Sequence, residues 1–261
     1  MQDLTMTDRM PALFVGHGSP MNAIEDNEFS LAWEKAGNAL PSPRAILCIS
    51  AHWETTGTRI TAMPEPVTLY DFQGFPKSLY EKRYPAPGAP ELARSIKKNL
   101  SEVVVHLDSG WGLDHGAWSV LCRMFPQANI PVLQLSLDFD QPPAYHYELG
   151  QKLKYLRSQG VLILGSGNMV HNLRTMVWED TAFDWALEFD ARLAEAIRSG
   201  DHQAMISYQS MGNHAHLAVP TNEHFLPLLY VLALQEPSDS VCFFCDRVTL
   251  GSISMRSVQF A

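Results

Sequence analysis

Histidines follow three short apolar runs of the chain in closely similar ways. His17 comes directly after one run, His52 shortly after a second, and His171 after a glycine-rich turn that follows a third. Such runs are typical of buried strands. If the strands are parallel, their carboxyl ends lie at one edge of a sheet, where open α/β sheets bind ligands. We therefore expect the three imidazoles to converge. The runs are residues 12–15, 45–50 and 161–164.

Two further histidines have settings that suit a functional site. His115 follows a glycine-rich turn ahead of an expected helix, and His224 is expected in the first turn of a helix, beside Glu223. The other five histidines rank below these: His106 is expected at a sheet edge, His146 on a helix surface, His202 exposed, and His214 and His216 in the loop before His224.

A cluster of imidazoles with almost no cysteine indicates a site for Zn²⁺ or Fe²⁺, one ion per chain, because magnesium and calcium prefer oxygen ligands. Three protein ligands would leave positions open for water or substrate. We expect His17, His52 and His224 on the metal, with His171 and His115 beside the substrate. His171 is alternatively a fourth ligand.

Histidines beyond the ligand set have a use of their own, because a free imidazole exchanges protons near neutral pH. The long spacing contains no short zinc motif such as HExxH, so the pattern alone also allows two or three of these histidines to be loop residues without a metal.

Composition narrows the class of protein. The chain has 261 residues, 46% of them hydrophobic, and a net charge of −9 with no basic block, which disfavours nucleic acid and anionic membranes as partners. No long uncharged apolar run predicts a membrane span, and the polar N-terminus lacks a signal-peptide core. We expect a cytoplasmic protein that acts on a small molecule, with oligomerisation left open. Cys48 is expected in the core, and the Cys242–Cys245 pair in a strand, without a metal.

The order of apolar runs and helical patterns predicts one α/β domain over residues 1–261, with a central, mostly parallel sheet flanked by helices and made mixed by a final hairpin. Residues 59–63 are expected as an edge strand, and residues 64–88, rich in Pro, Gly and aromatics, as a pocket wall or lid. The main helices are expected at residues 28–40, 90–100, 117–125, 145–157, 183–198 and 223–234. Asn27 is expected to cap the first of these helices, and Gly160 and Gly200 to end the fourth and fifth.

Five motifs follow one another along the chain. They are Gly16-His-Gly-Ser-Pro20, Ser50-Ala-His-Trp53, Asp114-His-Gly-Ala-Trp118, Ser166-Gly-Asn-Met-Val-His-Asn172 and Thr221-Asn-Glu-His-Phe-Leu-Pro-Leu228. In this order they resemble the class III extradiol ring-cleaving dioxygenases, and most closely their 4,5-DOPA dioxygenase branch. The resemblance covers nearly the whole chain, including residues 70–75 and 84–88.

The resemblance implies a single α/β domain, a non-haem Fe²⁺ and cleavage of a catechol such as L-DOPA by O₂. It implies His17 and His52 as metal ligands, with His115 and His171 beside substrate and oxygen. His224 falls at the third ligand position, where distant members use a glutamate. A site of three or four histidines also suits Zn²⁺.

Two other functions remain as alternatives. A zinc hydrolase would use the same histidines to hold a metal that lowers the pKa of bound water to about 7. A non-catalytic protein would keep the fold for binding only.

Overall fold

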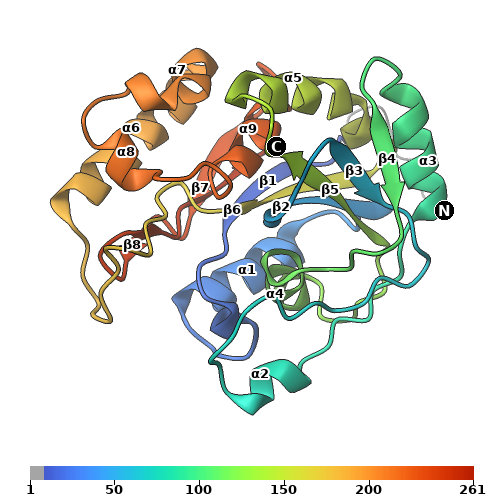
Figure 1. Ribbon diagram of the computed structural model, residues 1–261, viewed down its shortest axis with the longest axis horizontal. Coiled ribbons are helices and arrows are strands. Elements are labelled where there is room, and N and C mark those ends of the chain that lie inside the picture. Colours follow the sequence, from blue (N-terminus) through green and yellow to red (C-terminus); the bar gives the residue numbers. More distant parts are fainter. Residues whose placement is uncertain (1–8) are drawn as a thin grey trace.

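An eight-stranded sheet forms the centre of the computed structural model, which describes residues 9–261 (Figure 1). The strand order across the sheet is β4-β3-β5-β2-β6-β1-β10-β7. Its strands are β1 (Ala12–Gly16), β2 (Ala45–Thr55), β3 (Thr58–Thr61), β4 (Val105–Asp108), β5 (Val132–Asp138), β6 (Val161–Gly167), β7 (Val241–Phe244) and β10 (Ser257–Phe260). A separate two-stranded sheet pairs β8 (Val248–Thr249) with β9 (Ile253–Ser254).

The sheet is mixed, as expected, with three parallel pairs at its centre and a fourth at one edge. β2 runs parallel to both β5 and β6, β1 runs parallel to β6, and β3 runs parallel to β4. β7 and β10 form the predicted final hairpin pairing. The expected edge position of β3 is wrong: β4 covers one side of β3, and β5 pairs antiparallel with the other. Only Thr56 and Gly57 separate β3 from β2, so the chain turns back at once and reverses its direction.

Helices cover both faces of the sheet (Figure 1). They are α1 (Glu28–Ala39), α2 (Lys77–Glu81), α3 (Pro90–Asn99), α4 (His115–Met124), α5 (Pro143–Leu153), α6 (Asp184–Ser199), α7 (His202–Ile206), α8 (Ala215–Ala218) and α9 (Leu226–Leu232). Short 3₁₀ turns are η1 (Pro20–Ala23), η2 (Lys154–Gln159) and η3 (Tyr208–Ser210). In the part of the chain that the structure describes, no helix has the length and hydropathy to cross a bilayer.

The strands alternate between two hydrophobic clusters. Leu13 and Val15 of β1 pack on the side of α1 and α4, whereas Ala12 and Phe14 pack on the side of α5, α6 and α9. Burial on both faces explains why the central strands are continuously apolar in sequence. Cys48 lies in the first of these clusters, as expected.

The local signals at helix ends are confirmed. The Asn27 side chain accepts hydrogen bonds from the first-turn amides of α1, and Gly160 and Gly200 end their helices at φ 75° and 69°. The predicted helix 223–234 begins later, at Leu226, with Pro227 in its first turn. His224 therefore precedes α9 instead of lying in its first turn, because the proline is accommodated at the helix start.

His52 lies within β2 rather than after it. β2 continues past the predicted end at Ser50, but its pairing with β5 changes register between Ile49 and Glu54. Its pairing with β6 ends at Ser50. An irregularity of this kind redirects side chains locally and is frequent beside functional sites. His52 thus leaves the regular ladder at the edge of the sheet where His17 also emerges.

The end of β6 packs closely against the segment that carries His224. The Asn168 amide donates to the His224 carbonyl oxygen at 2.9 Å. A Cβ on Gly167 would lie only 2.1 Å from that oxygen. Position 167 therefore requires glycine, and the contact holds the His224 segment against the sheet.

Gly167→Ala is expected to lower the free energy of unfolding by roughly 1–3 kcal/mol, because the added methyl forces the His224 segment away from β6. Urea unfolding followed by circular dichroism measures this. Gly110→Ala is the matched control, since its Cβ would lie in ordinary van der Waals contact with Asp108 Oδ1, at 3.7 Å. Equal stability of the two variants would contradict this packing.

Candidate metal centre

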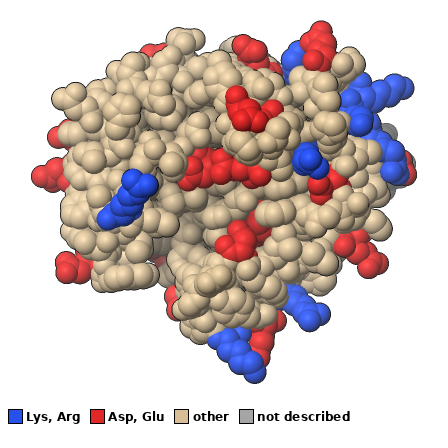
Figure 2. All heavy atoms as spheres, in the orientation of Figure 1, with Lys and Arg blue, Asp and Glu red and all other residues tan. Residues whose placement is uncertain are grey.

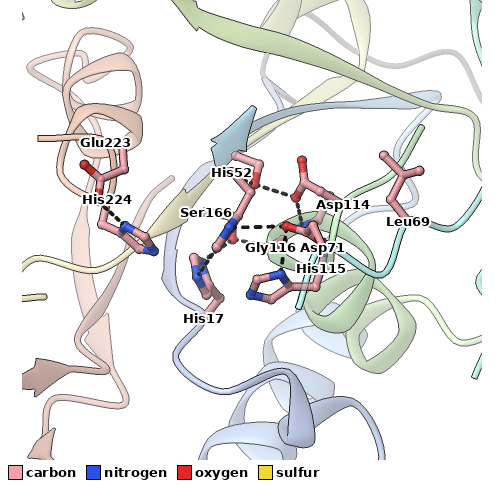
Figure 3. A network of polar contacts seen from close by, with 12 residues as sticks. His17, His52, Leu69, Asp71, Asp114, His115, Gly116, Ser166, Glu223 and His224 are labelled. Carbon is pink, nitrogen blue, oxygen red and sulfur yellow. Dashed lines mark hydrogen bonds and ion pairs between the residues drawn. The ribbon is translucent and has the colours of Figure 1, made fainter. Parts of the chain in front are cut away.

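Five histidines from separate parts of the chain converge at the carboxyl edge of the central strands. Figure 3 shows His17, His52, His115 and His224. His17 follows β1, His52 lies in the irregular part of β2, and His115 is the first residue of α4. His171 follows β6, and His224 precedes α9. All five line one cavity of about 370 Å³. The convergence predicted from the three strand ends is present, and it includes His115 and His224.

Three of the rings form a nearly equilateral triangle. The ring centroids of His17 and His52 are 5.0 Å apart, those of His17 and His224 5.3 Å, and those of His52 and His224 5.1 Å. The His115 ring lies 3.9 Å from that of His52 and 5.6 Å from that of His17. The His171 ring is stacked on His224 at 3.5 Å, with an angle of 10° between the planes.

Carboxylates contact the Nδ1 atoms of three rings, on the side that faces away from the centre of the cluster. His115 Nδ1 donates to Asp71 at 3.0 Å, and the His115 amide donates to the other oxygen of the same carboxylate at 2.9 Å. His52 Nδ1 lies 3.3 Å from Asp71 as well. His224 Nδ1 donates to Glu223 at 2.9 Å. With Nδ1 protonated in each neutral ring, Nε2 keeps its lone pair.

Burial keeps the cluster uncharged. Burial, and then the neighbouring imidazoles, lower the pKa of His17 and of His224 well below the usual range. Burial also lowers the pKa of His52 to about 3, helped by His115, and that of His171 to about 4. These four rings are therefore neutral at pH 7, the form in which imidazole binds a metal or accepts a proton.

Asp71 remains ionised beside these rings. Burial opposes ionisation of this carboxyl, but the hydrogen bonds from His115 and the interactions with both rings outweigh it and lower the pKa of Asp71. The carboxylate can therefore orient His52 and His115 together and offset positive charge on either ring.

The donor atoms fit a transition-metal ion. His17 Nε2 and His52 Nε2 are 3.1 Å apart. Bonds of 2.0–2.1 Å to one tetrahedral ion separate two ligand nitrogens by about 3.3 Å, so little movement is needed. Two groups of residues bring their ligand atoms within 4.8 Å of one another: His17, His52 and His115, and His171, Glu223 and His224. Neither group is the expected set of His17, His52 and His224, so the cluster can hold a metal but offers more than one ligand set.

The lower-ranked histidines do not contribute to the cavity. His106 is exposed on the edge strand β4, as expected. The expected surface position of His146 is wrong: the residue is fully buried, because α9 covers α5 and places the Tyr230 hydroxyl 3.1 Å from His146 Nδ1. His202 is half-buried and contacts Tyr147 and Gln235 rather than being exposed.

Asp71 and Ser166 had no assigned role in the sequence reasoning. Asp71 lies in the aromatic stretch 64–88, where residue spacing gives no indication of a partner 44 positions away. Ser166 Oγ lies 3.0 Å from His17 Nδ1. The expectation that this stretch forms a pocket wall is supported, since Asp71, Phe72 and Phe75 line the cavity.

The outer part of the cavity is apolar. Its wall includes Leu173, Met176 and Trp178 from the segment before α6, and Trp178 is 84% exposed at the mouth. Among the described residues, 9–261, no lysine or arginine lines the cavity. On the face in Figure 2, acidic side chains gather near the centre, whereas most lysines and arginines lie toward the periphery. An uncharged aromatic ring suits such a wall.

Comparison with known proteins identifies the family of the chain. The family model described as the catalytic LigB subunit of aromatic ring-opening dioxygenase matches residues 11–244. The chain therefore belongs to this family of metal-dependent, ring-cleaving enzymes.

Within the family, the relatives confirm the expected resemblance to the 4,5-DOPA dioxygenase branch. The chain is 45% identical over 266 residues to 4,5-DOPA dioxygenase extradiol from Escherichia coli (strain K12), covering 99% of this chain and 98% of the relative. It is 42% identical to the Beta vulgaris protein of the same name, over 82% and 83% of the two chains. A solved structure, of an uncharacterized Escherichia coli K12 protein, superposes with a TM-score of 0.86 at 42% identity, covering 97% of this chain and all of that one.

The buried neutral histidines predict a stability that falls as the solution is acidified. Below about pH 6.5 these histidines bind protons in the unfolded chain but stay neutral in the folded protein, because their pKa values are lower there. For His171, with a folded pKa of about 4, the loss reaches about 2 kcal/mol by pH 5. Urea unfolding of the metal-free protein at pH 7.5 and pH 5.0 measures this change.

His171→Gln is expected to lose less stability between these two pH values than the wild type, by about the same 2 kcal/mol. The comparison uses the difference between pH values, so a change in absolute stability does not affect it. An unaltered pH dependence in the variant would show that His171 is protonated as readily in the folded protein as in the unfolded chain.

Proposed function

We propose that this chain is an extradiol dioxygenase that cleaves the ring of a catechol such as L-DOPA with O₂, at one Fe²⁺ held by His17, His52 and His224. The single α/β domain would carry the whole reaction. The observation that supports this most strongly is the triangle of three buried, neutral imidazoles in a cavity with an apolar wall. The names of the relatives support the reaction and the substrate class.

The triangle favours this ligand set over the others. Three imidazoles on one ion, with metal–nitrogen bonds of 2.0–2.1 Å, have ring centroids about 5 Å apart. The separations of 5.0–5.3 Å agree, whereas His115 is only 3.9 Å from His52. His171 lies parallel to His224 at 3.5 Å, so the nitrogens of these stacked rings do not converge on one point. We therefore assign His171 beside the metal rather than on it.

Iron suits the reaction better than zinc. Zn²⁺ has no redox chemistry, whereas sites with three protein ligands and open positions are used by non-haem Fe²⁺ oxygenases. When bound, Fe²⁺ would supply open positions for both reactants and the electron transfer that O₂ requires. Membership in a ring-opening family disfavours the zinc hydrolase alternative.

His171 is our candidate for the acid–base residue. Its ring has no hydrogen-bond partner among residues 9–261, unlike the other four rings of the cluster. Because burial lowers its pKa to about 4, the ring is neutral and can accept a catechol hydroxyl proton. The proton so gained would then be available for return to the product.

His115 is our candidate for stabilising the substrate and oxygen. Asp71 holds its Nδ1 hydrogen, which leaves Nε2 beside the cluster. Phe72 contacts the His115 ring edge-on at 5.4 Å and continues the apolar wall. This wall would orient the aromatic ring of the substrate and exclude water from the reacting atoms.

Anaerobic loading with Fe²⁺ followed by L-DOPA in air is expected to give O₂ uptake and a yellow ring-opened product. His171→Ala is expected to retain iron but to lose product formation, because the catechol proton has no acceptor. Oxygen electrode traces and visible spectra measure both. If the protein holds iron yet cleaves the ring of no catechol tested, the chain is a binding protein and the proposal fails.

Metal affinity separates the ligand sets. His224→Ala is expected to weaken Fe²⁺ binding by on the order of 100-fold, because a bond to the metal is lost, whereas His115→Ala is expected to change affinity much less. Anaerobic titration with a competing chelator measures this. A comparable loss in His115→Ala alone would replace His224 with His115 in the ligand set.

A further inference from the structure

Ser166 lies between the two strands that deliver His17 and His52. In β6 it is level with Val15 of β1 on one side and with Ser50 of β2 on the other. Its side chain is fully buried. Figure 3 shows its hydroxyl between the His17 ring and Gly116 of α4.

The single hydroxyl hydrogen of Ser166 is donated to one identifiable acceptor. Ser166 Oγ lies 2.5 Å from the Gly116 carbonyl oxygen, which can only accept a hydrogen bond. Toward His17 Nδ1, at 3.0 Å, the same oxygen must therefore act as the acceptor. The Nδ1 atom of His17 then carries the ring hydrogen, and in a neutral ring Nε2 is left with its lone pair.

The start of α4 is placed so that this contact can form. A Cβ on Gly116 would lie 2.5 Å from Ser50 Oγ and 3.0 Å from the His52 ring. Asp114, the residue that caps α4, accepts a hydrogen bond from Ser50 at 2.6 Å. These contacts bring the Gly116 carbonyl to Ser166 and keep it there.

A competing state exists for the His17 ring. His17 Nε2 and His52 Nε2 are 3.1 Å apart, and Asp71 holds the Nδ1 side of His52. If the His17 hydrogen moved to Nε2, it would be donated to His52 Nε2. His17 Nε2 would then carry a hydrogen in place of its lone pair, and His52 Nε2 would use its lone pair as the acceptor, which closes the site to a metal.

We propose that Ser166 is a positioning residue that fixes the His17 tautomer with hydrogen on Nδ1, and so keeps both Nε2 atoms open for the metal. The inference rests on the proposed function in that it takes His17 and His52 as ligands. Ser166 acts only through His17 and contacts neither metal nor substrate. Removing its hydroxyl leaves the Nδ1 hydrogen without an acceptor and favours the competing state.

Nitrogen-15 NMR of the full-length, metal-free protein tests the tautomer directly. At pH 7.5 the wild type is expected to show His17 with hydrogen on Nδ1, and Ser166→Ala to show it on Nε2. A wild-type His17 with hydrogen on Nε2 would overturn the proposal, whether or not the variant folds.

Metal titration provides the second readout. Ser166→Ala is expected to bind Fe²⁺ about 10–100-fold more weakly than the wild type, the usual effect of losing a residue that orients a ligand. Ser119→Ala is the matched control: Ser119 is buried in α4, its hydroxyl has no partner in the described residues, and its affinity should match the wild type.

Equal affinity in Ser166→Ala and the wild type would overturn the role of Ser166. Neither readout depends on ring cleavage. A protein that gives both expected results but opens no catechol would therefore overturn the proposed function and leave the assignment of Ser166 supported.

Discussion

The site depends on hydrogen-bond acceptors that hold the outer nitrogens of its histidines. Each neutral imidazole has one ring hydrogen, and four of the five rings direct it outward. Asp71 takes two of these contacts, Glu223 one and Ser166 one. The Nε2 atoms of these four rings are left with free lone pairs that face a buried space. Because burial opposes protonation, a metal ion is the partner that such a set favours.

The sheet fixes the positions of the histidines relative to one another. β1, β6 and β2 are adjacent and parallel, so their carboxyl ends bring His17, His171 and His52 to one edge. Helices on both faces bury β1, β6 and residues 45–51 of β2, which leaves these strands little freedom to move apart. The first turn of α4 and the segment before α9 then add His115 and His224 from the two faces. The resulting cavity is polar at its base and apolar at its mouth.

Sequence reasoning was most successful where the signal is local. Apolar runs followed by histidine identified three of the converging residues, and Asn27, Gly160 and Gly200 marked helix ends correctly. It was less successful for features that depend on neighbours. The interior position of β3 depends on β4, and the burial of His146 depends on α9.

The partners of the histidines were the least predictable part of the site. A carboxylate or hydroxyl that fixes a ring has no periodic pattern, and Asp71 and Ser166 are far from their partners in sequence. Only Glu223, adjacent to His224, could be suspected from the sequence itself. Packing decides which acceptor meets which ring, and these contacts determine which nitrogens face the cavity.

The central claim is that one iron ion binds to His17, His52 and His224 through Nε2. Anomalous diffraction at the iron edge, from crystals grown anaerobically with Fe²⁺, tests it most directly. We expect one peak bonded to these three nitrogens, with His171 beside it and unbound. A peak held by either group whose donor atoms lie close together, His17 with His52 and His115, or His171 with Glu223 and His224, would contradict this assignment.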